Sequence, residues 1–149
     1  MPLLDSEHID AGIRQLGLAE DVVRLERADA EAVVKRAETA FLDSGGGSWW
    51  DRFHEPTATA QFEDDRAFER LATFSPSPDR PCYLIVDVEE VPAVYLLKPD
   101  LATRVLAESP FMEYCLVGET FTWLLCENHH GALIGCGTAA AKVASAAAA

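Results

Sequence analysis

Positive charge is scarce in this sequence. Twelve Lys and Arg residues stand against 25 Asp and Glu residues in a chain of 149, so the formal net charge is −13. Such a charge repels the phosphates of nucleic acids and the head groups of anionic lipids, and it speeds encounters with cationic proteins. The composition therefore argues against nucleic acid and membrane surfaces as partners. The acidic surface either keeps the protein soluble, which charge alone favours, or also binds a basic protein.

Long hydrophobic runs are missing as well. The longest apolar stretch, the alanine-rich end after Cys136, is interrupted by Lys142 and Ser145. The N-terminus has neither the basic start nor the apolar stretch of a signal peptide. We therefore expect no membrane-spanning segment and a cytoplasmic location.

Complete catalytic or metal motifs are also absent. The glycines at 45–47 follow a predicted helix rather than a strand, and no Lys-Ser or Lys-Thr comes after them, which argues against a phosphate-binding loop. No pair of residues has the C-x-x-C or H-x-x-x-H spacing of common zinc sites. The sequence thus contains no motif that identifies a reaction.

Cysteine occurs at four positions, all of which border or interrupt apolar runs: Cys82, Cys115, Cys126 and Cys136. Because no secretory signal accompanies them, we expect buried, reduced thiols. Apolar runs at 120–127 and 132–137 flank Asn-His-His-Gly, which predicts a β-hairpin. An even loop would place Cys126 and Cys136 on opposite faces of this hairpin, whereas an odd loop would place them on one face but out of register. Neither arrangement permits a disulfide between them.

Helical spacing of apolar residues dominates the first half of the chain, and short apolar strands dominate the second. The predicted helices are a first helix capped by Ser6 and ending at Gly17, a second from Asp29 to Leu42, a third beginning at Asp64 or Asp65, and a fourth over 99–109. The predicted strands are 82–87, 94–97, 114–117, 120–127 and 132–137, with a proline-rich linker at 75–81 before them.

This order of elements predicts an α+β fold, in which N-terminal helices pack on one face of a C-terminal antiparallel sheet of β-hairpins. The length and the hydrophobic content of 49% fit a single domain over residues 1–138. Residues 139–149 are alanine-rich and form either a tail or a short helix. Of the adjacent Trp49 and Trp50, one ring is expected in the core and the other near His54 at the surface.

The predicted hairpin tip carries the densest set of reactive side chains. Cys126, Glu127, His129 and His130 offer thiolate, carboxylate and imidazole groups, which are zinc ligands. Cys126 with His129 and Asn128 also has the residue types of a nucleophilic triad. Glu127 with a neighbouring His could act as an acid and base pair, or a hydrogen bond between them could simply fix the turn. Two adjacent His residues seldom reach one ion, and such triads normally assemble from distant segments, so structural roles are favoured for these residues.

The segment Trp123-Leu124-Leu125-Cys126-Glu127-Asn128-His129-His130-Gly131 resembles the ending of a family of small, uncharacterised bacterial proteins. The likeness extends from Trp49-Trp50 through Tyr114 to Gly137 and implies no particular activity. More distantly, helices leading into an antiparallel sheet, with Trp-rich and Glu-rich segments, resemble the SUKH-type superfamily of bacterial immunity proteins. That resemblance implies a cytoplasmic binder that neutralises a toxin, commonly a nuclease.

These observations favour a non-catalytic, cytoplasmic protein-interaction module that binds a basic protein. If the protein is of the immunity type, that partner is a toxin or effector. No cofactor is expected, and the oligomeric state is left open. The candidate binding residues are Trp50, His54, Glu127, Asn128, His129 and His130. The alternative is a metal-dependent or Cys/His enzyme acting through residues 126–130, with zinc held by Cys126, His129 and His130.

Overall fold

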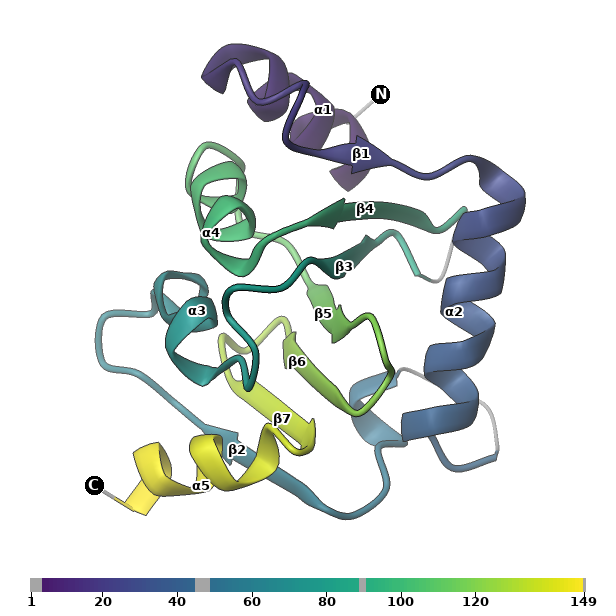
Figure 1. Cartoon of the computed structure of the whole chain (residues 1–149). Helices are drawn as coiled ribbons and strands as arrows, with labels where there is room; N and C mark the ends of the chain where they lie inside the picture. The colour runs from purple at the N-terminus through teal and green to yellow at the C-terminus, as the bar shows by residue number, and fades with distance from the viewer. Residues whose placement is uncertain (1–3, 45–48, 89–90, 149) are drawn as a thin grey trace.

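The computed structural model describes residues 4–44, 49–88 and 91–148 (Figure 1). Within them, seven strands form one antiparallel sheet in the order β1-β4-β3-β5-β6-β7-β2. The strands are β1 (Val23–Arg24), β2 (Thr57–Ala60), β3 (Cys82–Val86), β4 (Ala93–Leu97), β5 (Tyr114–Gly118), β6 (Trp123–Glu127) and β7 (Leu133–Gly137). The helices are α1 (Asp5–Leu16), α2 (Arg27–Phe41), α3 (Leu71–Phe74), α4 (Pro99–Ala107) and α5 (Ala140–Ala148), with 3-10 turns η1 (Trp49–Asp51) and η2 (Ala67–Arg70). The expected α+β class is confirmed.

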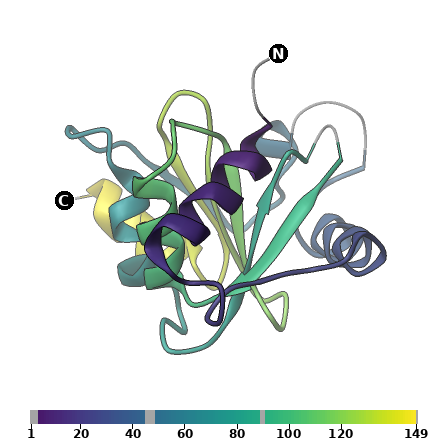
Figure 2. The same ribbon diagram turned by 90° about the horizontal axis from the view of Figure 1, so that it is seen from above.

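Helices cover both faces of the sheet, so the expectation of a single covered face is wrong. Helix α2 packs on one face, and α1, α3, α4 and α5 pack on the other (Figure 2). Alternate residues of each central strand enter different cores: Leu116 faces α1 and α4, whereas Cys115 and Val117 face α2. Because both faces are buried, these strands are continuously apolar, and the sequence pattern does not show how many helical layers they need.

Helix α1 begins differently from the prediction. Leu4 is its N-cap, and Ser6 lies inside the helix without capping it, so the prediction of a Ser6 cap is wrong. The carboxylate of Asp87, at the end of β3, accepts hydrogen bonds from the backbone N–H groups of Asp5 (3.2 Å) and Ser6 (3.0 Å). A residue far along the chain thus supplies the acceptor that a local cap would provide.

The two edge strands were not predicted, because each is short and only partly apolar. Strand β1 pairs with β4, and β2 pairs with β7. Helix α5 lies over β2 and β7, with Val143 buried. A Cβ atom on Gly135 would lie 2.6 Å from Val143 Cγ2 and 3.0 Å from the Ala139 carbonyl oxygen, so this glycine permits the close approach of α5.

The predicted β6–β7 hairpin is present, and its loop 128–132 has an odd number of residues. Cys126 lies opposite Ile134 and Cys136 opposite Leu124, so the two cysteines share a face but are out of register. All four cysteines are buried and free, as expected. No helix of the described ranges is long and apolar enough to cross a membrane.

Candidate functional site

The tip of the β6–β7 hairpin is built around Asn128. Its side-chain Oδ1 accepts hydrogen bonds from the backbone N–H groups of His130 (3.0 Å) and Ala132 (3.2 Å). Gly131 adopts a positive φ of 77° and donates its N–H to the Asn128 carbonyl oxygen. Asn128 therefore holds the turn through local hydrogen bonds and presents the two histidines on its outer side.

Both histidines are exposed, and each is anchored to a different neighbouring segment. The backbone N–H of His129 donates to Glu113 Oε2 at 3.0 Å, and His129 Nδ1 lies 3.1 Å from the same oxygen. The carbonyl oxygen of His130 accepts a hydrogen bond from Gln61 Nε2 at 2.9 Å. The imidazole rings lie 3.8 Å apart. The tip is thus tied to the segment before β5 and to the loop after β2.

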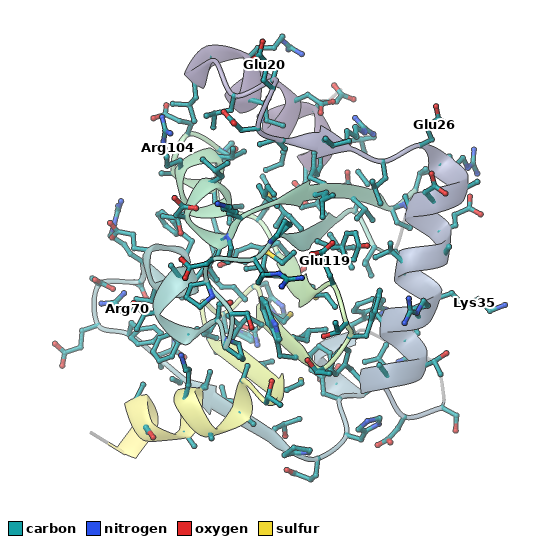
Figure 3. The ribbon with its side chains drawn as sticks, viewed as in Figure 1. Glu20, Glu26, Lys35, Arg70, Arg104 and Glu119 are labelled. Atoms are coloured by element: carbon teal, nitrogen blue, oxygen red, sulfur yellow. The ribbon has the colours of Figure 1, made fainter. Side chains whose placement is uncertain are left out.

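These three segments project from one edge of the molecule. In Figure 2 the tip is the yellow-green loop at the upper edge, whereas the purple connection after α1 lies at the lower edge. Figure 3 labels Glu20, which lies in this connection after α1. We call the exposed and half-buried residues at the tip edge the tip surface: Gln61, Asp65, Phe111, Glu113, His129 and His130.

A cavity of about 310 Å³ is lined by two residues of the tip surface, Asp65 and Phe111. Its polar lining includes Asp65, Tyr114 and Glu127. Its apolar lining comes from η2, the end of α4 and the segment before β5, namely Phe68, Leu106, Phe111 and Met112. This volume is at the lower end of the range for ligand pockets, so the cavity has room for one side chain or a small molecule.

Glu127 is the most unusual residue of the cavity. It is only 1% exposed, and the Tyr114 hydroxyl donates a hydrogen bond to its Oε1 at 2.9 Å. The other oxygen, Oε2, is buried and has no hydrogen-bond partner among the described residues. Burial raises the pKa of Glu127 to about 7; the hydrogen bond from Tyr114 opposes this rise, and the negative charge of Asp65 adds to it. The carboxyl group is therefore poised between its neutral and charged forms near neutral pH.

Some charged side chains around the cavity form ion pairs, and others do not. Arg70 binds both oxygens of Asp64, at 3.0 and 2.9 Å, and Arg66 pairs with Glu69. Within the described ranges, neither Asp65 nor Glu127 takes part in an ion pair. Two carboxyl groups thus remain available on this side for a positively charged group.

The residues expected to act together at the tip are separated by the fold. Strand alternation sends Cys126 to the α2 face and Glu127 to the α4 face, beside Trp123 and Leu125. Glu127 hydrogen-bonds Tyr114, and His129 contacts Glu113 instead. In the part of the chain that the structure describes, no group of three or more His, Cys, Asp or Glu side chains could hold a metal ion.

The two other candidates lie outside the tip. His54 precedes β2, and its Nδ1 lies 3.5 Å from Asp43 Oδ1. Residue 57 pairs with residue 136 and residue 60 with residue 133, so His54 is at the end of β7 opposite the tip. Trp50 belongs to η1, but its side chain is outside the described part of the structure. The expected core ring is that of Trp49, which is buried.

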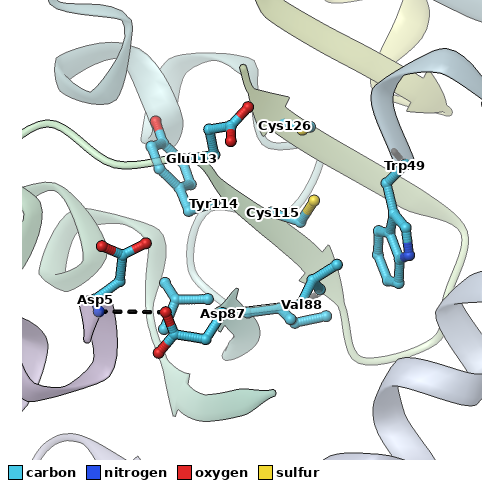
Figure 4. A pocket seen from close by; sticks show the side chains of 10 residues that line it. Asp5, Trp49, Asp87, Val88, Glu113, Tyr114, Cys115 and Cys126 are labelled. Carbon is cyan, nitrogen blue, oxygen red and sulfur yellow. Dashed lines mark hydrogen bonds between the residues drawn. The ribbon is translucent and has the colours of Figure 1, made fainter. Parts of the chain in front are cut away.

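A second cavity, of about 110 Å³, lies where β3 ends and β5 begins, and residues from both faces of the sheet line it (Figure 4). Cys115 and Cys126 are direct cross-strand neighbours there, and Trp49 also lines the space. A hydrogen bond with Cys115 and burial raise the pKa of the Cys126 thiol well above its usual value. A protonated, buried thiol is a poor nucleophile, so this arrangement fits a structural role.

A family model matches residues 7–147, which is almost the entire chain. The chain belongs to DUF6756, a family of unknown function. Membership confirms the expectation of an uncharacterised family, and the likeness to the SUKH-type superfamily stays a prediction. Comparison with curated proteins gave no match, and comparison with solved structures gave none either. For this DUF6756 member, functional inference therefore depends on the site.

Sequence reasoning missed the residues that complete the cavity, notably Tyr114, Asp65 and Phe111. One signal was available: Trp123, Leu125 and Glu127 occupy alternate positions of one strand, which places Glu127 on the same buried face as two apolar residues. The position of Asp65 carried no such signal, because its loop is brought to the tip only when β2 pairs with β7.

Proposed function

We propose that this DUF6756 member is a non-catalytic binding module that engages a basic protein through the tip surface. The supporting observation is the combination at one edge of an exposed aromatic ring, uncompensated carboxyl groups and a cavity. Phe111 is 59% exposed, and it lines the same cavity as Asp65 and Glu127. Aromatic anchors next to pockets typically contribute most of the affinity of protein interfaces, whereas net charge mainly speeds association.

The narrower form of the proposal concerns the class of partner. The resemblance to SUKH-type immunity proteins suggests a toxin or effector, and a nuclease toxin carries positive charge because it binds phosphates. The net charge of −13 is complementary to such a partner. A cytoplasmic location would follow from this role.

The alternative of an enzyme acting through residues 126–130 has less support. It requires Cys126 as a reactive thiolate, but the thiol is buried and its pKa is raised. It also requires the imidazoles to face that thiol or a shared metal ion, whereas His129 is bound to Glu113. Asn128 is used for the turn.

A capture experiment with matched variants tests the proposal. The tip variant carries Asp65→Asn and Phe111→Ala, and Asn tolerates the positive φ of 54° at position 65. The control carries Asp21→Asn and Val23→Ala, which are equivalent changes at exposed residues of the opposite edge. The immobilised protein is exposed to lysate from its own cells, and each captured protein is identified, purified and titrated against all three forms.

We expect wild type and control to bind the same basic protein, and the tip variant to bind it at least about tenfold more weakly, as is typical when an interface anchor is lost. A tip variant that binds as tightly as the control would refute the use of this surface. Purified protein that holds no partner but turns over a small molecule would refute the binding role itself.

A further inference from the structure

The unpaired oxygen of Glu127 indicates what the cavity accommodates. A buried carboxylate oxygen without a hydrogen bond is costly, and native proteins rarely keep one without a ligand, an ion or a functional reason. Oε2 has no partner among the described residues, although Glu127 lines the cavity. A hydrogen-bond donor that enters through the cavity would satisfy this oxygen.

The charges around the cavity favour a cationic donor. Asp64 and Arg66 also line the cavity, but Asp64 is paired with Arg70 and Arg66 with Glu69. The lining carboxyl groups outside these ion pairs are those of Asp65 and Glu127. Among the described residues, the Tyr114 hydroxyl is the hydrogen-bond partner of the Glu127 carboxyl group, and it is neutral because burial raises its pKa. An incoming cation would thus meet two uncompensated carboxyl groups.

The geometry distinguishes between the two common cationic side chains. A guanidinium binds a carboxylate best through two parallel hydrogen bonds, one to each oxygen. Oε1 of Glu127 already accepts the Tyr114 hydroxyl at 2.9 Å, so a guanidinium bound to both oxygens would share Oε1 with Tyr114, whereas Oε2 has no donor among the described residues. A compact ammonium group needs one such oxygen and can direct its other protons towards Asp65. The apolar residues Phe68, Leu106, Phe111 and Met112 line a path that suits a chain of methylene groups.

We propose that the cavity receives a lysine side chain of the basic partner, with its ammonium group bound to Glu127 Oε2 and its methylene stem packed against the apolar wall. The inference relies on the proposed function for the source of the lysine. The raised pKa of Glu127 adds a pH dependence: the carboxylate form is the one that binds, so affinity rises between about pH 5 and about pH 8.

Two measurements with the intact protein test this inference. The first adds n-butylammonium chloride, a mimic of the lysine side chain, at millimolar concentration and follows the amide signals of Tyr114 and Glu127 by NMR. Butylguanidinium is the matched probe, and Glu127→Gln is the matched variant. We expect butylammonium to shift these signals more than butylguanidinium does, and the shifts to be lost in the variant. Equal shifts in wild type and variant would overturn the inference.

The second measurement uses the captured partner before and after acetylation of its lysines. We expect acetylation of the partner and the Glu127→Gln substitution each to weaken binding about tenfold or more, and the two together to add little to either one. A partner that depends on the tip surface but is indifferent to both changes would overturn the lysine inference and leave the proposed function standing. Butylammonium binding without any captured partner would overturn the proposed function and show a site for free amines.

Discussion

Replacing Glu127 by Gln should remove a pH-dependent loss of stability. Gln has nearly the same shape as Glu and keeps a carbonyl oxygen for the Tyr114 hydroxyl, but it cannot ionise. The pKa of Glu127 is raised from 4.5 in the unfolded chain to about 7 in the folded protein, because the carboxyl group is buried. The folded state therefore binds the proton more tightly than the unfolded state does.

The sign and size of the effect follow from this difference in pKa. Below about pH 4.5 Glu127 is protonated in both states and carries no penalty. As pH rises from there to about 7, the Glu127 carboxyl ionises in the unfolded chain but stays protonated in the folded protein, so the free energy of unfolding falls. Above about pH 7 the carboxyl is ionised in both states, and the free energy of unfolding falls no further through this group. A shift of about 2.5 pKa units corresponds to about 3 kcal/mol, most of it between pH 5 and pH 8.

Urea denaturation at about pH 5 and about pH 8 measures this difference. The wild type should lose about 2 to 3 kcal/mol more than Glu127→Gln does on going from the lower to the higher pH. Glu20→Gln, at an exposed carboxyl on the opposite edge, should keep the wild-type pH dependence. Identical pH dependence in the wild type and Glu127→Gln would show that Glu127 is not buried as described.

Three further predictions concern the fold. Gly135→Ala should lower the free energy of unfolding by about 1 to 3 kcal/mol in urea titrations, because the new Cβ meets Val143; adding Val143→Ala should relieve part of this clash, and a cost that does not depend on Val143 would contradict the reasoning. Asp87→Gly, which accepts the positive φ of 56° but has no acceptor oxygen, should cost about 1 kcal/mol through loss of the α1 cap, whereas Asp87→Asn, which keeps an acceptor oxygen, should cost less; equal costs would refute the capping role. All four cysteines should resist a thiol reagent such as DTNB in native protein and react in denaturant, and rapid native labelling would show that they are accessible.

Local patterns predicted many of the elements. Apolar residues at helical spacing located α1 and α2 to within a few residues, and the Asn-His-His-Gly tetrapeptide located the β6–β7 turn. These predictions succeed because side-chain periodicity and turn chemistry depend on near neighbours. Strands β1 and β2 escaped prediction because they are short edge strands, which form through pairing with β4 and β7 rather than from strong propensity.

The sequence predicted only part of the candidate site. Glu127, Asn128, His129 and His130 stood out as a cluster of polar residues, but adjacency in the chain concealed their different roles. Asn128 holds the turn, His129 contacts Glu113, and Glu127 points to the opposite face from Cys126. Strand alternation accounts for that separation, and the residues that complete the cavity come from three other segments.

The sequence alone establishes the fold class, the hairpin and the acidic character of this chain. These features depend on composition and on the spacing of near neighbours, which are the same before and after folding. The burial of Glu127, its bond to Tyr114 and the capping of α1 by Asp87 arise from contacts between residues far apart in sequence. Such contacts form only when the strands pair in the observed order, and that order is stabilised by the burial of both faces of the whole sheet. The chemistry of the cavity belongs to this second level, because a carboxyl group acquires its pKa and its unpaired oxygen from its surroundings rather than from its place in the chain.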